Sequence, residues 1–195
     1  LLRGDAFGLW FAAKDAQAGL EMMFLSIDGT LHLYDLQPFG DSSPSQGLSI
    51  EDGFIIAAGD GTGRQLAKLD RDGGYQWLTS MTKEGTTTPI SVMAPAFGIQ
   101  QLGDILVFDV VYRGADATLF GYSLTTDTLQ ELSNSILAPG HSNEVVSNGN
   151  TIWFDCVLSH TGMELCQTDG TVTGTKLTVD LMPGISTSQP RSMAY

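Results

Sequence analysis

The sequence predicts an all-β protein, a β-propeller built from four repeats of four-stranded antiparallel meanders, and three observations support this prediction. The first is composition: only 16% of the 195 residues are charged, against roughly 25% in an average soluble domain, and 23 are glycine. The second is local pattern, because short apolar runs bounded by Gly, Asp, Ser and Thr are typical of strands and turns. The third is a repeat. Similar apolar runs begin at Gly8, Gly53, Gly103 and Gly149, at intervals of 45, 50 and 46 residues, and such a period is typical of propeller blades.

Each repeat contains the same elements in the same order, as the first one illustrates. An apolar strand over residues 8–15 is followed by a second strand at 20–26 and a third at 31–36. A link rich in Pro, Gly and Ser occupies residues 37–45, with Pro where no ladder donor is needed and Gly where a positive φ is required. A short apolar element at 47–50 closes the repeat.

The repeats form one predicted domain over residues 1–195. A single four-stranded meander cannot bury both of its faces, so we expect neighbouring units to stack against each other. Both a closed four-bladed ring and a segment of a larger propeller satisfy this requirement. The predicted units cover residues 8–52, 53–102, 103–148 and 149–195.

The fourth unit carries a recognisable motif. Its stretch GMELCQTDGTVTGTKLTVDLMPGISTSQPRSM resembles the ELWxTDGTxxGT repeat of secreted and surface-associated bacterial proteins, with Cys166 where that family usually has Trp and Leu181 where it has Ile. The matching residues are Glu164, Leu165, Thr168, Asp169, Gly170, Thr171, Gly174, Thr175, Asp180, Pro183, Gly184 and Pro190. The first unit matches more loosely, at Glu21, Asp28, Gly29, Thr30, Asp35, Leu36, Pro38, Gly40, Ser42, Ser43 and Pro44. The resemblance implies an exported β-propeller-like protein, often part of a large multi-repeat polypeptide, and it implies no defined activity.

Turn chemistry explains why Asp and Gly recur in this motif. In Thr-Asp-Gly-Thr the Asp side chain accepts hydrogen bonds from backbone N–H groups two residues on, and the Gly takes the position that needs a positive φ. We therefore predict structural roles in the repeat turns for Asp28, Gly29, Asp169, Gly170 and Gly174.

The two cysteines predict a disulfide. A tight turn near Thr161 would place Cys156 opposite Cys166, because both lie five residues from it. Directly opposed Cα atoms on antiparallel strands are about 4.5 to 5.5 Å apart, which is within disulfide range. Export to an oxidising compartment would favour the Cys156–Cys166 bond, and the alternative is two packed thiols.

The charge balance argues against nucleic acid as a partner. Nine Lys and Arg face 22 Asp and Glu, so the net charge is −13, and a phosphate-binding surface needs clustered cations. No stretch has the pattern of a transmembrane helix, since the longest uncharged run, which includes residues 86–103, is interrupted by Pro89 and Pro95.

We predict no catalytic, cofactor-binding or metal-binding residues. The sequence contains no HExxH motif, no GxSxG motif and no zinc-type Cys and His spacing. Structural calcium is the one ion that the sequence leaves open, because the chain is acidic and its turns are rich in oxygen. Asp70 and Asp72 resemble the opening of a calcium loop, but Gly74 and Met81 stand where later ligands are required.

We therefore expect a non-enzymatic binding or scaffold module of a surface or extracellular assembly, secreted or periplasmic, that uses propeller faces for protein interaction or self-association. The alternative is a carbohydrate-binding or carbohydrate-cleaving propeller with a site in its central funnel. Glu21 and Glu164 hold equivalent second-strand positions and could serve there as paired carboxylates. We expect Trp10 and Trp153, in equivalent first strands, to pack between blades rather than to bind sugar.

Overall fold

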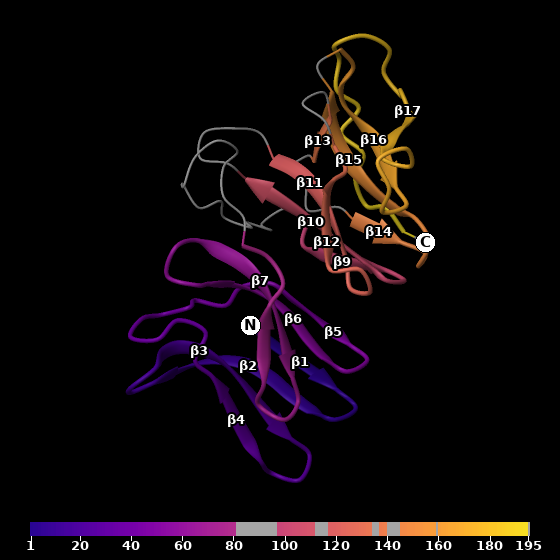
Figure 1. Ribbon diagram of the computed structural model, residues 1–195. Coiled ribbons are helices and arrows are strands. Elements are labelled where there is room, and N and C mark those ends of the chain that lie inside the picture. Colours follow the sequence, from indigo (N-terminus) through magenta and orange to yellow (C-terminus); the bar gives the residue numbers. More distant parts are fainter. Residues whose placement is uncertain (81–96, 112–116, 134–136, 140–144, 159, 195) are drawn as a thin grey trace. The chain divides into compact units, whose positions relative to one another are not determined.

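The computed structural model describes residues 1–80, 97–111, 117–133, 137–139, 145–158 and 160–194. In this part of the chain all regular elements are β-strands, and they form four antiparallel sheets (Figure 1). The prediction of an all-β protein of repeated antiparallel meanders is confirmed. The chain divides into two compact units, Leu1–Val92 and Met93–Tyr195, which we call the N-terminal and C-terminal units.

The N-terminal unit contains two four-stranded meanders, in which each strand pairs with the next one along the chain. Sheet 1 consists of β1 (Leu2–Asp5), β2 (Gly8–Asp15), β3 (Gly19–Ser26) and β4 (Leu31–Tyr34). Sheet 2 consists of β5 (Gly47–Ile50), β6 (Gly53–Gly59), β7 (Arg64–Asp70) and β8 (Tyr75–Trp77).

The C-terminal unit repeats this arrangement with one irregularity: in sheet 4 both β13 and β14 pair with the same edge of β15. Sheet 3 consists of β9 (Ile99–Leu102), β10 (Ile105–Val111), β11 (Ala117–Ser123) and β12 (Thr128–Glu131). Sheet 4 consists of β13 (Leu137–Pro139), β14 (Val145–Ser147), β15 (Ile152–Leu158), β16 (Gly162–Thr168) and β17 (Lys176–Val179).

The sheets are offset by one strand from the repeats of the sequence. The apolar element at 47–50, which closes the first predicted unit, is β5, and it pairs with β6 as the first strand of sheet 2. The corresponding element of the third predicted unit contains β14, which pairs with β15 of sheet 4. The first link therefore leads into sheet 2, whereas sheet 4 receives both β13 and β14 ahead of β15.

A separate apolar core fills each unit. In the N-terminal unit the fully buried Trp10 lies between sheets 1 and 2, where its ring centroid is 4.3 Å from that of Phe24 and 5.0 Å from that of Phe54. In the C-terminal unit Leu119 of sheet 3 packs in one cluster with Phe154 of sheet 4. Alternate residues of the strands supply these side chains, as the period of two in a pleated strand requires.

Candidate functional site

A buried glutamate holds the link that follows sheet 1. Glu21 is the third residue of β3 and is fully buried. Its carboxylate accepts hydrogen bonds from the backbone N–H groups of Leu36, at 3.1 Å, and Ser42, at 2.9 Å, and from the Ser42 hydroxyl. One carboxylate therefore holds two points of the link that are six residues apart, Leu36 and Ser42.

Glu164 does the same for the segment that follows sheet 4. It is the third residue of β16, is fully buried, and accepts hydrogen bonds from the N–H groups of Leu181, at 2.9 Å, and Ser188, at 3.2 Å. Burial raises the pKa of Glu164, but the hydrogen bonds from Ser188 and Leu181 outweigh this effect and hold the pKa below its usual value. Glu164 is thus an ionised structural acceptor. We call residues 35–46 and 180–190 the anchored links.

A glycine two residues before each glutamate lets the link approach the strand. Gly19 and Gly162 open β3 and β16 with φ of 87° and 72°. A Cβ at Gly19 would lie 2.7 Å from the Gly40 carbonyl oxygen, and one at Gly162 would lie 2.5 Å from the Ser186 carbonyl oxygen. Both sites therefore need glycine for its backbone conformation and for its lack of a side chain. This Gly-x-Glu pattern is visible in the sequence, but the strand pattern alone gives the glycine no role.

The anchored links project apolar side chains into solvent. In the link after sheet 1, Phe39 is fully exposed and has a positive φ of 69°. In the link after sheet 4, Ile185 is 85% exposed, and Leu181 and Met182 are about half exposed. Leu181, Met182 and Ile185 lie within five residues of one link, and exposed apolar side chains that lie together mark interaction sites more often than single ones do.

The turn residues predicted in the first unit make the expected hydrogen bonds and have the expected backbone conformation. Asp28 accepts hydrogen bonds from the Ser26 hydroxyl and from the Thr30 N–H, at 3.0 Å, and Gly29 has a φ of 90°. The hydrogen bonds from Ser26 and Thr30 lower the pKa of Asp28 to about 2.

The equivalent turn of the fourth unit is more elaborate. Asp169 accepts hydrogen bonds from the Thr171 hydroxyl, at 2.7 Å, and from the Thr171 N–H, at 2.9 Å, and these bonds hold its pKa below the usual value. Gly170 takes the positive φ, at 84°. Gly174 has a different role, because a Cβ at this position would overlap the Asp169 carboxylate.

Gly174→Ala should therefore destabilise the C-terminal unit. The added methyl group displaces the Asp169 carboxylate from Thr171, and we expect a loss of about 1–2 kcal/mol in the free energy of unfolding. Urea unfolding measures this loss. Val172→Ala in the same turn is the control, since Val172 is 47% exposed and should change stability little. Equal effects of the two substitutions would refute the role given to Gly174.

Cys156 and Cys166 form a disulfide in the structure, with their Cα atoms 5.8 Å apart. The predicted register of their strands is wrong, because Cys156 pairs with Glu164, and Cys166 pairs with Phe154. Leu158 pairs with Gly162, so the hairpin is centred one residue before Thr161 and the two cysteines are diagonal neighbours. Both side chains are fully buried in the core of the C-terminal unit.

Removal of the disulfide with the double substitution Cys156→Ala and Cys166→Ala should cost about 2–3 kcal/mol in the free energy of unfolding. A closed loop of about ten residues restricts the unfolded chain by this amount. Urea unfolding with and without dithiothreitol measures the effect, and the double variant should not respond to the reductant. Two free thiols in the folded wild-type protein, detected by non-reducing mass spectrometry, would contradict the assignment.

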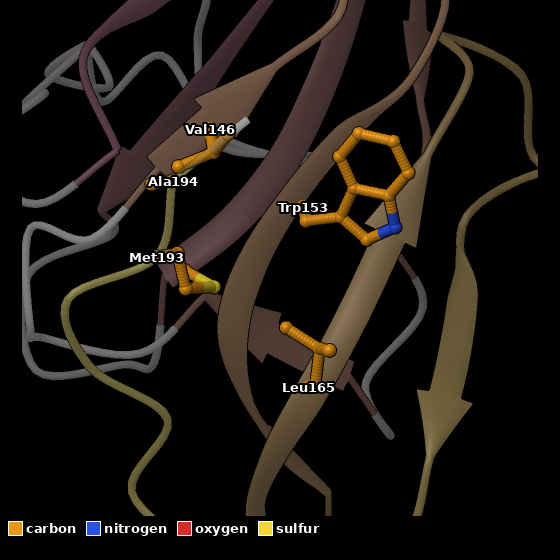
Figure 2. Close-up of a pocket in the computed structure, with 5 residues that line it drawn as sticks. All are labelled: Val146, Trp153, Leu165, Met193 and Ala194. Carbon is orange, nitrogen blue, oxygen red and sulfur yellow. The ribbon is translucent and has the colours of Figure 1, made fainter.

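An apolar pocket of about 330 Å³ lies on sheet 4 (Figure 2). Among the described residues, the pocket is lined by Val146 of β14, Trp153 of β15, Leu165 of β16, and Met193 and Ala194 near residue 195. Trp153 is only partly buried here, whereas Trp10 at the equivalent position of sheet 1 is fully buried. The expectation of a core tryptophan is confirmed for Trp10.

Asp109 is a buried carboxylate that the sequence analysis did not identify. It lies on β10 among apolar residues, is 1% exposed, and neither carboxylate oxygen has a hydrogen-bond partner among the described residues. Burial raises its pKa to about 7. The equivalent positions of sheets 1 and 2 hold Ala12 and Ala57, which pair with Met22 and Leu66 as Asp109 pairs with Leu119.

No cluster of three or more His, Cys, Asp or Glu side chains suited to a metal ion occurs in the described part of the chain. In the candidate calcium loop, the Asp72 carboxylate accepts a hydrogen bond from the Gly74 N–H at 3.2 Å, as in an ordinary turn. Among the described residues no helix has the length and apolar character needed to cross a membrane.

Comparison with known proteins shows the fold but no family. No protein-family model matches the chain, and no curated protein resembles it significantly. Solved structures do resemble it. A puromycin hydrolase matches 90% of this chain with a TM-score of 0.63 at 15% identity, and a mutant of puromycin hydrolase complexed with PGG matches 90% with a TM-score of 0.61 at 16% identity. A puromycin-hydrolyzing peptidase of Mycobacterium tuberculosis matches 88% with a TM-score of 0.60 at 14% identity.

These matches establish the class of protein as a β-propeller. The chain spans only 27–28% of the length of the solved proteins. At 14–16% identity the resemblance concerns the fold alone.

Proposed function

We propose that this chain is a non-enzymatic, exported binding module of a surface or extracellular assembly, and that it contacts protein partners through its anchored links. The observation that carries the proposal is Phe39, a fully exposed aromatic side chain on a loop fixed by the buried Glu21. Ile185, on the link held by Glu164, is the corresponding feature of sheet 4.

Fixed loops with apolar tips have the physical properties of a protein-binding site. A loop that is already ordered loses little conformational entropy on binding, so more of the interaction energy appears as affinity. Aromatic and aliphatic anchors at the centre of an interface contribute much of that energy. The links combine both properties.

The disulfide supports export, because such bonds persist in oxidising compartments.

The glycan alternative depends on Glu21 and Glu164 as paired carboxylates, and their surroundings do not favour that role. Glu21 and Glu164 are buried and bound to backbone N–H groups, so neither is free to act as a general acid or base on a sugar. The hydrolase activity named for the structural neighbours belongs to chains more than three times as long.

Site-specific photo-crosslinking tests the proposal. A photoreactive phenylalanine analogue is placed at position 39 or 185 in protein exported by a bacterial host, and adducts are identified by mass spectrometry. Position 27 is the matched control, because Ile27 is 81% exposed but lies at the opposite end of β3 from the link. We expect discrete protein adducts from positions 39 and 185 and none from 27. Retention of the chain in the cytoplasm, or equal adducts from all three positions, would refute the proposal.

A further inference from the structure

An exposed Asn-Gly turn joins β14 to β15. Asn148 and Gly149 are both exposed, and Gly149 has a positive φ of 88°. The Asn148 N–H donates to the Thr151 carbonyl at 3.2 Å, which closes the turn directly after β14 ends at Ser147. Of the four asparagines in the sequence, only Asn148 is followed by a glycine.

The side-chain amide of an asparagine is open to attack by the backbone nitrogen of the next residue. In this turn the Gly149 nitrogen would form a bond to Cγ of Asn148, and the bond from Cγ to Nδ2 would break. The Gly149 proton and the Nδ2 amino group leave together as ammonia. The product is a cyclic succinimide, and addition of one water molecule opens it to aspartate or isoaspartate. A following glycine favours the reaction because no side chain shields its nitrogen.

Three hydrogen bonds of the turn involve the groups that react. The Asn148 Oδ1 accepts hydrogen bonds from the N–H groups of Asn150, at 2.9 Å, and Thr151, at 2.8 Å. Negative charge develops on this oxygen when Cγ is attacked, so the two donors stabilise the tetrahedral intermediate as an oxyanion hole does. The Gly149 N–H donates to the Ser147 hydroxyl at 3.0 Å, so an acceptor already contacts the proton that must leave.

We propose that Asn148 is a site of spontaneous deamidation in the folded chain, with the Gly149 nitrogen as nucleophile and the Ser147 hydroxyl as the acceptor of its proton. The N–H groups of Asn150 and Thr151 stabilise the intermediate. The reaction replaces a neutral amide by a carboxylate, so each modified chain gains one negative charge. The inference concerns a turn outside the anchored links and is independent of the proposed function.

A turn of sheet 2 already has the form that the aspartate product would take. The Asp60 Oδ1 accepts hydrogen bonds from the N–H groups of Thr62, at 2.7 Å, and Gly63, at 2.8 Å. The Asp60 N–H donates to the Gly63 carbonyl at 3.1 Å, and Gly61 has a φ of 89°. These are the hydrogen bonds of the turn at 148–151, with a carboxylate in place of the amide. Aspartate at position 148 is therefore compatible with the turn, whereas isoaspartate adds a methylene group to the backbone and is not.

Peptide mass spectrometry during incubation in mildly alkaline buffer tests the proposal. The rate of deamidation at Asn148 is measured in the folded chain and in the same chain unfolded in guanidinium chloride with its disulfide intact. Because the fold places donors on Oδ1 and an acceptor on the Gly149 proton, we expect the folded chain to react about fivefold faster. Asn150 is the internal control, since it is exposed in the same turn but precedes Thr151, and it should remain unmodified over the same period.

Two variants test the part played by the hydroxyl group. Ser147→Ala should slow deamidation of the folded chain about fivefold and leave the rate of the unfolded chain unchanged. Ser147→Thr keeps a hydroxyl group and should react at the wild-type rate. The proposal would be overturned if the folded wild type reacted no faster than the unfolded chain, or if Ser147→Ala and Ser147→Thr reacted at the same rate when folded.

Discussion

Replacing Glu21 by alanine is expected to lower the free energy of unfolding of the N-terminal unit by about 3–5 kcal/mol. The substitution removes the acceptor for two backbone N–H groups and one hydroxyl, and it leaves the donors of Leu36 and Ser42 without their buried partner. Urea unfolding followed by tryptophan fluorescence measures the loss, because Trp10 lies in the core of the same unit.

Two further substitutions sharpen this experiment. Glu21→Gln should cost less than Glu21→Ala, because one acceptor oxygen remains and Gln65 holds the equivalent position in sheet 2. There Gln65 accepts a hydrogen bond from the Thr79 hydroxyl at 2.8 Å. Glu51→Gln, on an exposed turn, should leave stability unchanged. A Glu21→Ala variant as stable as the Glu51 variant would contradict the role assigned to Glu21.

Asp109 is expected to make the C-terminal unit less stable as the pH rises from about 4 to 7. The folded state raises the pKa of this carboxyl from 3.8 to about 7, so between these values the folded chain holds a proton that the unfolded chain has released. The contribution of protonated Asp109 to the free energy of unfolding is therefore complete below pH 3.8 and is lost as the pH rises to about 7. At 1.36 kcal/mol per unit of pKa, the total loss is roughly 4 kcal/mol.

Asp109→Asn should remove this dependence and raise stability at pH 8 by about 2–4 kcal/mol, because no charge is then buried. The difference between wild type and variant in urea unfolding at pH 4.5, 6, 7 and 8 isolates the contribution of Asp109. Comparison at each pH is necessary because carboxyls with lowered pKa, such as Asp28, act in the opposite direction in acid. A difference that does not change with pH would refute the assignment.

The sequence was sufficient to predict the repeated architecture, because strand pattern and turn chemistry are local. Apolar runs, Asp-Gly turns and Pro-rich links recur at a period that is typical of stacked meanders. Which strand begins each sheet could not be predicted in the same way. The element at 47–50 can join either neighbouring sheet, and its pairing with β6 is decided by the tight turn between Ile50 and Gly53.

The site was harder to predict because its residues act over long distances in the chain. Glu21 and Glu164 were recognised as equivalent, but their partners lie 15 to 24 residues away in links whose backbone path no strand pattern describes. Trp10 and Trp153 also occupy equivalent positions, yet one is buried and the other borders a pocket.

Buried glutamates hold the links in a fixed conformation, and amide hydrogen exchange at Leu36 and Ser42 tests this role most directly. In the wild type we expect both amides to exchange about a hundredfold more slowly than in an unfolded chain. In Glu21→Ala they should exchange at nearly the unfolded rate, while the amides of β3 keep their protection. Equal exchange of Leu36 and Ser42 in the two proteins would contradict the claim.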